Sequence, residues 1–441
     1  MKKIIFILTA VFYFSSAHAQ KAWTLEECIQ YAIANNITIK KIQLDRENVE
    51  INLNTAQMSR LPNLNAGMGQ NWSFGRTQIQ SGLYENRSQS NTNLSVSSST
   101  PLFTGFRITN EIERNKLALQ AATENLAKAK EDLSLGVASL FLQVLFCKEL
   151  LKVNEEQLLL SRTQVTKTQT LFEAEKVPPS QLYDIEAQMA KDEVSVVQAK
   201  NNLALALLDL AQSLELENQT GFDVYAPETK DVISEYMSSV QPPQIIYNNA
   251  LNIKPVVKAQ EYNVQGAEKY LAIAKSGYFP SLNLSLGYGT NYFYQYKYAN
   301  DPFGDQFKNN ANEYIGLNLN IPIFNRYSTR NQVRSAQLNI HNQQLELDNV
   351  KKTLYKEIET AYLNATAAQE KYRASDKAVK ATTESFKYAQ ERYEIGKSSV
   401  FEFSEAKTRL VQSQSEQIQA KYDYIFRTKI LDFYNGIPIE L

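Results

Sequence analysis

Histidine and cysteine, the residues that most often ligate metals or act as nucleophiles, are scarce in this sequence. The chain has two histidines and two cysteines among 441 residues. His341 lies in the polar run NIHNQQ, which is typical of a solvated helix face, and His18 lies within the first nineteen residues, which we expect to be removed. The close glycines of GMGQNWSFG fall in a strand pattern without a following helix, unlike a phosphate-binding loop. We therefore expect no enzyme, no metal site and no cofactor.

Charge and cysteine content narrow the class of protein further. The chain carries 46 basic and 47 acidic residues, a formal net charge of −1, which argues against a nucleic-acid partner. Two cysteines, Cys28 and Cys147, are too few for a disulfide framework.

The first nineteen residues predict a signal peptide. A basic start, MKK, precedes an apolar core from Ile4 to Phe14 and a small-residue cleavage site at Ala17-His18-Ala19. Cys28 lies too far past that site to become a lipidated first residue. No later stretch approaches eighteen uninterrupted apolar residues, so we expect no transmembrane helix. An exported chain of this kind is either soluble or part of a β-barrel.

The elements that position the remaining side chains occur twice. AQMSRLPNLNAGMGQ (56–70) is similar to AKSGYFPSLNLSLGY (274–288), and LFEAEKVPPSQLYD (171–184) is similar to RYEIGKSSVFEFSE (392–405). A long internal period of this kind indicates duplicated structural units. We predict a first repeat at residues 20–217, a linker or equatorial segment at 218–245 and a second repeat at 246–441.

Each repeat contains two segments with the period of two that is typical of strands, at about residues 62–75, 91–103, 281–296 and 312–324. Apolar side chains occupy one face of these strands; the membrane-facing candidates are Leu64, Trp72, Leu282, Leu284, Leu286, Tyr288, Leu317 and Leu319. A soluble hairpin with one wet face has the same pattern. The tyrosine-rich run at 288–298 favours a lipid-facing barrel wall. Because four strands cannot close a barrel, several chains must share one.

Long helices follow the strands, at about 107–172, 180–217, 327–394 and 399–434. Their apolar residues recur at gaps of three and four, the spacing of helices that wind around one another, with Cys147 as a small core residue. A tube and a coiled-coil scaffold fit this pattern equally well. Each helix pair turns at a break that we predict to be a partner-docking tip, formed by Val177, Pro178, Gly396, Ser399 and Val400.

Several segments resemble the TolC-like outer membrane efflux protein family, also called outer membrane factors. The resemblance covers essentially all of residues 21–434, and the segments that carry it are WTLEECIQYAIANNITIKKIQ, PLFTGFR, IPIFNRY and ERYEIGKSSVFEFSEAK. The resemblance implies an α+β membrane protein in which four strands per chain join a shared trimeric 12-stranded transmembrane β-barrel. A long α-helical coiled-coil barrel continues it into the periplasm. The strand-to-helix switches at PLFTGFR and IPIFNRY are then the two places where a chain leaves the outer membrane.

The resemblance also implies a homotrimer that passively conducts substrates handed over by a periplasmic adaptor (membrane fusion protein) and an inner-membrane pump. It places an acidic pore constriction at Glu402 and Glu405, with Asp184 as the corresponding acid of the first tip. Acids near a helix start are also common without such a role. Family members can carry an arginine two residues after the tip glycine; here that residue is Ser398, beside Lys397.

The sequence thus predicts an outer-membrane exit duct of a tripartite efflux or type I secretion system. A periplasmic coiled-coil scaffold or adaptor without a barrel is the first alternative. The second is an outer-membrane adhesin that binds through surface loops at about 76–90 and 297–311.

Overall fold

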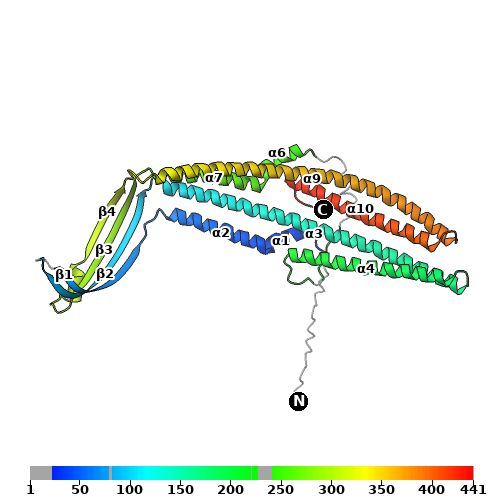
Figure 1. Cartoon of the computed structure of the whole chain (residues 1–441), viewed down its shortest axis with the longest axis horizontal. Coiled ribbons are helices and arrows are strands. Elements are labelled where there is room, and N and C mark those ends of the chain that lie inside the picture. The colour runs from blue at the N-terminus through cyan, green and yellow to red at the C-terminus, as the bar shows by residue number, and fades with distance from the viewer. Residues whose placement is uncertain (1–21, 79–81, 220, 227–240, 441) are drawn as a thin grey trace, which may run out of the picture. The chain divides into compact units, whose positions relative to one another are not determined.

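The computed structural model describes residues 22–78, 82–219, 221–226 and 241–440 (Figure 1). Contacts divide the chain into two compact units, one of Met1–Lys40, Ala129–Ile253 and Leu354–Leu441, the other of Lys41–Lys128 and Lys254–Thr353. Each unit draws on both halves of the sequence, so the compact units do not coincide with the sequence repeats. The predicted signal peptide lies outside the described residues, as do residues 220 and 227–240 of the predicted linker.

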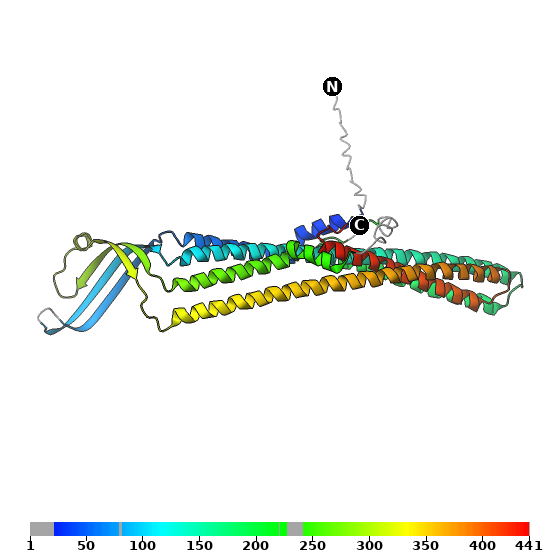
Figure 2. The same cartoon turned by 90° about the horizontal axis from the view of Figure 1, so that it is seen from above.

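The helices form two matched sets. In chain order they are α1 (Leu25–Asn35), α2 (Ile37–Met58), α3 (Arg107–Glu173) and α4 (Pro179–Ser213), then α6 (Pro243–Ile253), α7 (Pro255–Ser276), α9 (Ser328–Glu394) and α10 (Val400–Tyr434). Matched helices have equal lengths of 11, 22, 67 and 35 residues. At 1.5 Å per residue, α3 and α9 are each about 100 Å long. In the first unit α4 runs beside α3, and α10 beside α9 (Figures 1 and 2).

The second unit contains a four-stranded sheet of β1 (Asn65–Gln78), β2 (Tyr84–Phe103), β3 (Ser281–Gln295) and β4 (Asn312–Asn320). The strand order is β1-β2-β3-β4, and each neighbouring pair is antiparallel. β2 begins before the start predicted near residue 91. β4 ends at Asn320, before the predicted residue 324, because Asn320 pairs with Ser281, the first residue of β3.

The loops at the far end of this sheet differ from the predicted ones. Pairing of β1 with β2 continues to Gln78 and Tyr84, so much of the loop expected at 76–90 is a regular hairpin. The loop expected at 297–311 contains a short helix, α8 (Phe303–Asn309). Gln306 donates to the Phe293 carbonyl at 3.0 Å and accepts from the Phe293 N–H at 2.9 Å. Its amide thereby covers the edge of β3 beyond the last residue that pairs with β4.

The register gathers the apolar side chains of all four strands on one face. Cross-strand partners point to the same side of a sheet, and they include Met68 with Leu94, Val96 with Tyr288 and Leu284 with Leu317. This face is largely uncovered in the single chain: Trp72 is 65% exposed and Leu317 67%. Leu282, Leu286 and Leu319 share it, whereas Leu64 lies directly before β1 and is 76% exposed. Asn283 lies on the opposite face.

Each strand pair leads into its long helix through two consecutive residues in the left-handed region. They are Gly105 (φ 62°) and Phe106 (φ 66°) before α3, and Arg326 (φ 56°) and Tyr327 (φ 60°) before α9. Edge-to-face ring pairs accompany both turns, with centroids 5.5 Å apart for Phe103 and Phe106 and 5.6 Å apart for Phe324 and Tyr327. The strand-to-helix switch therefore has one conformation in both repeats.

The core of the first unit lies where α1, α3, α4 and α10 meet. Val137, Phe141 and Val144 of α3 are buried there with Leu210 of α4 and Cys28 of α1. Burial raises the pKa of the Cys28 thiol to about 12, so this cysteine stays protonated and unreactive at neutral pH. Cys147 is buried as predicted.

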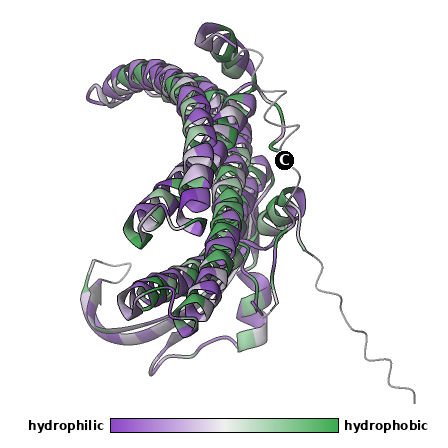
Figure 3. Ribbon diagram, turned by 90° about the vertical axis from the view of Figure 1, so that its right-hand side faces the viewer, coloured by the Kyte–Doolittle hydropathy of each residue, from purple (hydrophilic) through white to green (hydrophobic). Residues whose placement is uncertain are grey.

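The apolar residues of the long helices follow the predicted seams. Leu354, Ile358, Ala361 and Ala365 of α9 are buried at gaps of three and four. Hydrophobic and hydrophilic residues interleave along the helices (Figure 3). By length and composition α3 contains one stretch apolar enough to cross a membrane, and 39% of that stretch is buried in the protein.

Candidate functional site

The two predicted tips have the same backbone course. In the first, α3 ends at Glu173, Glu175 adopts φ 56°, and the Lys176 N–H donates to the Leu171 carbonyl at 2.9 Å. In the second, α9 ends at Glu394, Gly396 adopts φ 74°, and the Lys397 N–H donates to the Arg392 carbonyl at 2.8 Å. Helices commonly end at a residue in the left-handed region, which lets the following N–H groups donate to the last carbonyls of the helix.

The helices that leave the tips start differently. Ser399 is the N-cap of α10, and its hydroxyl accepts from the Glu402 N–H at 3.2 Å. Pro178 is the N-cap of α4 without a side-chain hydrogen bond, and Pro179 occupies the first turn. Proline is tolerated there because the first N–H groups of a helix lack intrahelical partners.

The tips enclose a groove of about 510 Å³. All five predicted docking residues line it: Val177, Pro178, Gly396, Ser399 and Val400. Across it the Gln181 side-chain amide donates to the Tyr393 hydroxyl at 3.4 Å, which links the first hairpin to the second. Phe172, Leu182, Phe386, Tyr393 and Phe403 form an apolar cluster behind the groove. The structure thus brings both tips into one surface.

The predicted acids are exposed and lie in two places. Asp184 lines the groove, whereas Glu402 and Glu405 project from the first turns of α10. Ser398 donates a hydrogen bond to the Glu402 carboxylate, and the Arg392 guanidinium lies 3.8 Å from it. The Ser398 hydrogen bond, and then the charge of Arg392, lower the pKa of Glu402. Glu405 pairs with Arg409 at 3.4 Å.

Ser398 stands where the resembled family can carry an arginine, and the structure shows an arginine reaching this position from elsewhere. Arg392, in the last turn of α9, donates to the Lys397 carbonyl at 3.3 Å and lies beside Glu402. A guanidinium therefore contacts the second tip, although it comes from the helix turn before the tip glycine rather than from a residue after it.

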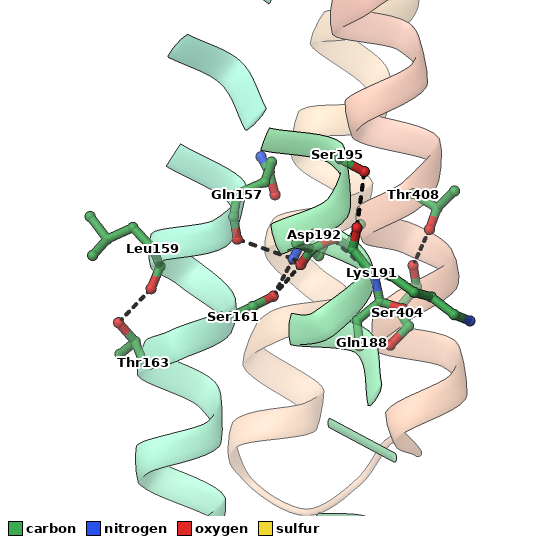
Figure 4. Close-up of polar contacts among 11 residues, drawn as sticks. Gln157, Leu159, Ser161, Thr163, Gln188, Lys191, Asp192, Ser195, Ser404 and Thr408 are labelled. Carbon is green, nitrogen blue, oxygen red and sulfur yellow. Dashed lines mark hydrogen bonds and ion pairs between the residues drawn. The ribbon is translucent and has the colours of Figure 1, made fainter. Parts of the chain in front are cut away.

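A buried lysine lies behind the tips, and the sequence interpretation missed it. Lys407 of α10 is 1% exposed; its ammonium lies 2.5 Å from an Asp192 carboxylate oxygen of α4 and 2.5 Å from the Ser161 hydroxyl of α3. Figure 4 shows Ser161, Gln157 and Asp192 converging from α3 and α4. The spacing of Phe403, Lys407 and Leu410, with gaps of four and three, places this lysine in the helix seam, which is the signal that could have revealed it.

Comparisons with known proteins decide the family. A model of the family described as outer membrane efflux protein matches residues 28–215 and 246–431. The chain belongs to the outer membrane efflux protein family. Outer membrane protein TolC of Escherichia coli K12 is 23% identical over 439 residues, covering 96% of this chain and 84% of TolC.

Solved channels share the fold of this efflux protein. The CusC structure has a TM-score of 0.75 at 18% identity and covers 94% of this chain and 92% of its own. The Campylobacter jejuni CmeC outer membrane channel has a TM-score of 0.75 at 17% identity, with coverages of 94% and 86%. The predicted α+β, two-repeat fold is confirmed. The protein is an outer-membrane exit duct for efflux or secretion with a periplasmic helical tunnel.

Proposed function

We propose that three copies of this chain close one barrel and one tunnel, through which substrates pass without energy from the duct itself. TolC-like channels are trimeric outer-membrane ducts that work with adaptors and pumps. The observation that carries the proposal for this chain is the uncovered apolar sheet face. A large exposed apolar surface on a four-stranded antiparallel sheet suits lipid, and two free edges suit pairing with further copies.

The polar face of the sheet supports a water-filled interior. Asn283, Ser285, Gly287 and Asn291 alternate along β3 with the apolar residues. The Tyr314 ring lies over Gly287, where an added Cβ would come within 2.3 Å of that ring. A tyrosine and small polar side chains on this face leave room for an aqueous lumen, whereas a packed soluble core would fill it with apolar residues.

The hairpin tips are the proposed docking surface for a periplasmic adaptor. The tip groove combines small and apolar residues with charged ones such as Lys176 and Asp184, and Phe401, which also lines it, is 76% exposed. An exposed aromatic side chain at the rim of a groove is the kind of anchor that protein interfaces use. The adaptor would deliver substrate from an inner-membrane pump to this end of the tunnel.

Cysteine cross-linking tests the docking surface. Cysteines at Val177 or Ser399 should cross-link to a periplasmic adaptor that mass spectrometry identifies, and cysteines at Leu83 or Asp301, at the opposite end of the strands, should not. Native Cys28 and Cys147 are buried and leave the background low. Adaptor cross-links from Leu83 or Asp301 alone would invert the proposed topology.

Glu402 and Glu405 are proposed as a cation-attracting constriction, with Asp184 as a weaker contributor. Their exposure is compatible with a pore-lining position, and three copies would bring six glutamates together. In planar bilayers the Glu402→Gln/Glu405→Gln variant should lose cation preference and block by multivalent cations. The difference should shrink above roughly 0.1 M salt, where the screening length falls below about 10 Å. An unchanged reversal potential would place these acids on a solvated outer face.

A further inference from the structure

The Lys407 cluster joins the two helical hairpins of the first unit. Its lysine comes from α10, in the second hairpin, and its partners come from α3 and α4, which form the first. Beyond Asp192 and Ser161, the ammonium donates to the Gln157 carbonyl at 3.2 Å. Asp192 in turn accepts from Ser161 at 2.5 Å and from Gln188 at 3.2 Å. The ammonium thus has three oxygen partners, all on the opposite hairpin.

The seam around the cluster differs from the seam of the main core. On α3 the buried residues of the core are Val137, Phe141 and Val144, whereas toward the tip Ser161, Gln164 and Thr168 are at most 3% exposed. The side-chain oxygens of Gln157 and Gln164 are buried without a hydrogen-bond partner. A polar seam with unmet acceptors is a poor source of cohesion.

The ion pair is likewise a poor source of stability. Burial, opposed by the neighbouring Asp192, lowers the pKa of Lys407 below its usual value. Buried ion pairs of this kind are often neutral or unfavourable relative to apolar side chains of similar size. A single buried polar residue in a helix seam can instead specify register, because only one alignment satisfies it.

The position of the cluster indicates what that register controls. Lys407 follows Glu402 and Glu405 on α10 by five and two residues, and Asp192 follows Asp184 on α4 by eight. Because both helices are continuous between these residues, fixing Lys407 against Asp192 fixes the relative height of the acids and of the two tips. An axial slip by one helical turn would shift them by about 5.4 Å.

We infer that Lys407 is a positioning residue: its ammonium, held by Asp192, Ser161 and the Gln157 carbonyl, locks the second hairpin onto the first and sets the separation of the two tips. The effect on the acidic constriction rests on the proposed function of Glu402 and Glu405. The effect on tip separation does not rest on that proposed function, so either effect can fail without the other.

A second lysine of α10 supplies a matched control. Lys421 lies fourteen residues, two heptads, after Lys407, and its ammonium is 3.0 Å from a Glu149 carboxylate of α3. Its side chain is 18% exposed and that of Glu149 35%, against 2% and 15% for Lys407 and Asp192. A better solvated pair farther from the tips is not expected to control their separation.

Pulsed electron–electron double resonance between spin labels at Lys176→Cys and Lys397→Cys, one on each tip, tests the inference. Both side chains are exposed. The labelled chain is diluted with unlabelled copies so that the measured distance lies within one chain. The parent should give one narrow distance distribution, Lys407→Met a distribution about twice as wide or shifted by about one helical turn, and Lys421→Met the parental distribution.

Two further variants separate positioning from simple loss of structure. The swap Lys407→Asp/Asp192→Lys should restore the narrow distribution. The apolar triple variant Lys407→Met/Asp192→Leu/Ser161→Ala should dissociate on heating at no lower a temperature than the parent, yet keep the wide distribution, because apolar packing offers cohesion without a unique register.

The inference is overturned if Lys407→Met or the triple variant assembles and keeps the narrow parental distance. It is also overturned if Lys421→Met widens the distribution as much as Lys407→Met does. If only Lys407→Met fails to assemble, the distance distributions of the triple variant and of the swap decide whether the inference holds. An unchanged reversal potential in the Glu402→Gln/Glu405→Gln channel would count against the constriction and leave the tip separation as a separate result.

Discussion

The two repeats build the same turns from different residues. Left-handed backbone occurs at Glu175 and Gly396, and at Glu215 and Gly436, pairs that are each 221 positions apart. In both of these pairs the glycine is in the second repeat. At the strand-to-helix junction it is in the first repeat, where Gly105 matches Arg326 of the second. The shared conformation is therefore required by the fold, whereas glycine at it is optional. A non-glycine residue there costs about 1 kcal/mol, which packing of the long helices outweighs.

The largest expected effect concerns the apolar strand face that both repeats share. Leu284→Arg in the second repeat and Ala66→Arg, its counterpart in the first, should each impair trimer assembly, Leu284→Arg by about 2–4 kcal/mol if it faces mid-bilayer lipid. Asn283→Arg on the polar face is the control and should assemble. Folding into lipid or detergent, followed by heat dissociation on gels, measures the effect. If arginine is tolerated equally on both faces, the sheet does not lie in a membrane.

Substitutions at the junctions before the two long helices should change the free energy of unfolding in opposite directions. At Gly105 an added Cβ would meet the Phe279 Cβ at 2.7 Å and the Ser276 carbonyl oxygen at 2.9 Å, in addition to its positive φ. Gly105→Ala should therefore lower the free energy of unfolding by about 2–3 kcal/mol. Arg326→Gly should raise it by up to about 1 kcal/mol. Denaturant titration of the assembled protein measures both changes in the free energy of unfolding. Equally small changes for the two variants would contradict the expected opposite effects.

At the left-handed position of each tip a substitution changes only the backbone strain, so smaller changes in the free energy of unfolding are expected. Gly396 has open space where a Cβ would be added, which leaves its φ of 74° as the whole penalty. Gly396→Ala should cost about 1 kcal/mol, and Glu175→Gly should gain about 0.5–1 kcal/mol. The same titrations compare them. A loss of stability in Glu175→Gly would mean that this glutamate makes a contribution beyond its backbone.

The helix starts after the tips give the smallest difference. Ser399→Ala removes the hydroxyl that accepts from the Glu402 N–H and should cost about 0.5–1 kcal/mol. Pro178→Ala, at the matching position without a side-chain cap, should change stability less. Local hydrogen exchange in the first turns of α10 and α4 reports each cap directly. Faster exchange after Pro178→Ala than after Ser399→Ala would contradict this assignment.

Periodicity and repetition were sufficient to predict the strands, the long helices and the tips. The gaps of three and four that Leu354 and Ile358 follow, and the alternation from Leu282 to Tyr288, come directly from which side chains avoid water. The same reasoning placed Val177, Pro178, Ser399 and Val400 at the turns between the long helices. These features depend on local spacing, which a single sequence contains.

Other features depend on contacts between distant segments. The extension of β2 back to Tyr84 is set by pairing with β1, and the amide of Gln306 satisfies a strand edge that only the fold creates. The spacing of Lys407 places it in the helix seam, but its partners Asp192 and Ser161 are known only once α3 and α4 are packed against it. The left-handed Glu175 and Arg326 carry no glycine to mark them; only their repeat counterparts indicate the turn.

The mass of the detergent-extracted outer-membrane protein, before and after heating, tests the shared duct most directly. Four strands with two free edges and one uncovered apolar face are expected to close only with further copies. Native mass spectrometry should give three chains in the unheated sample and one chain after heating. A stable single chain recovered from the soluble periplasmic fraction would contradict the shared barrel.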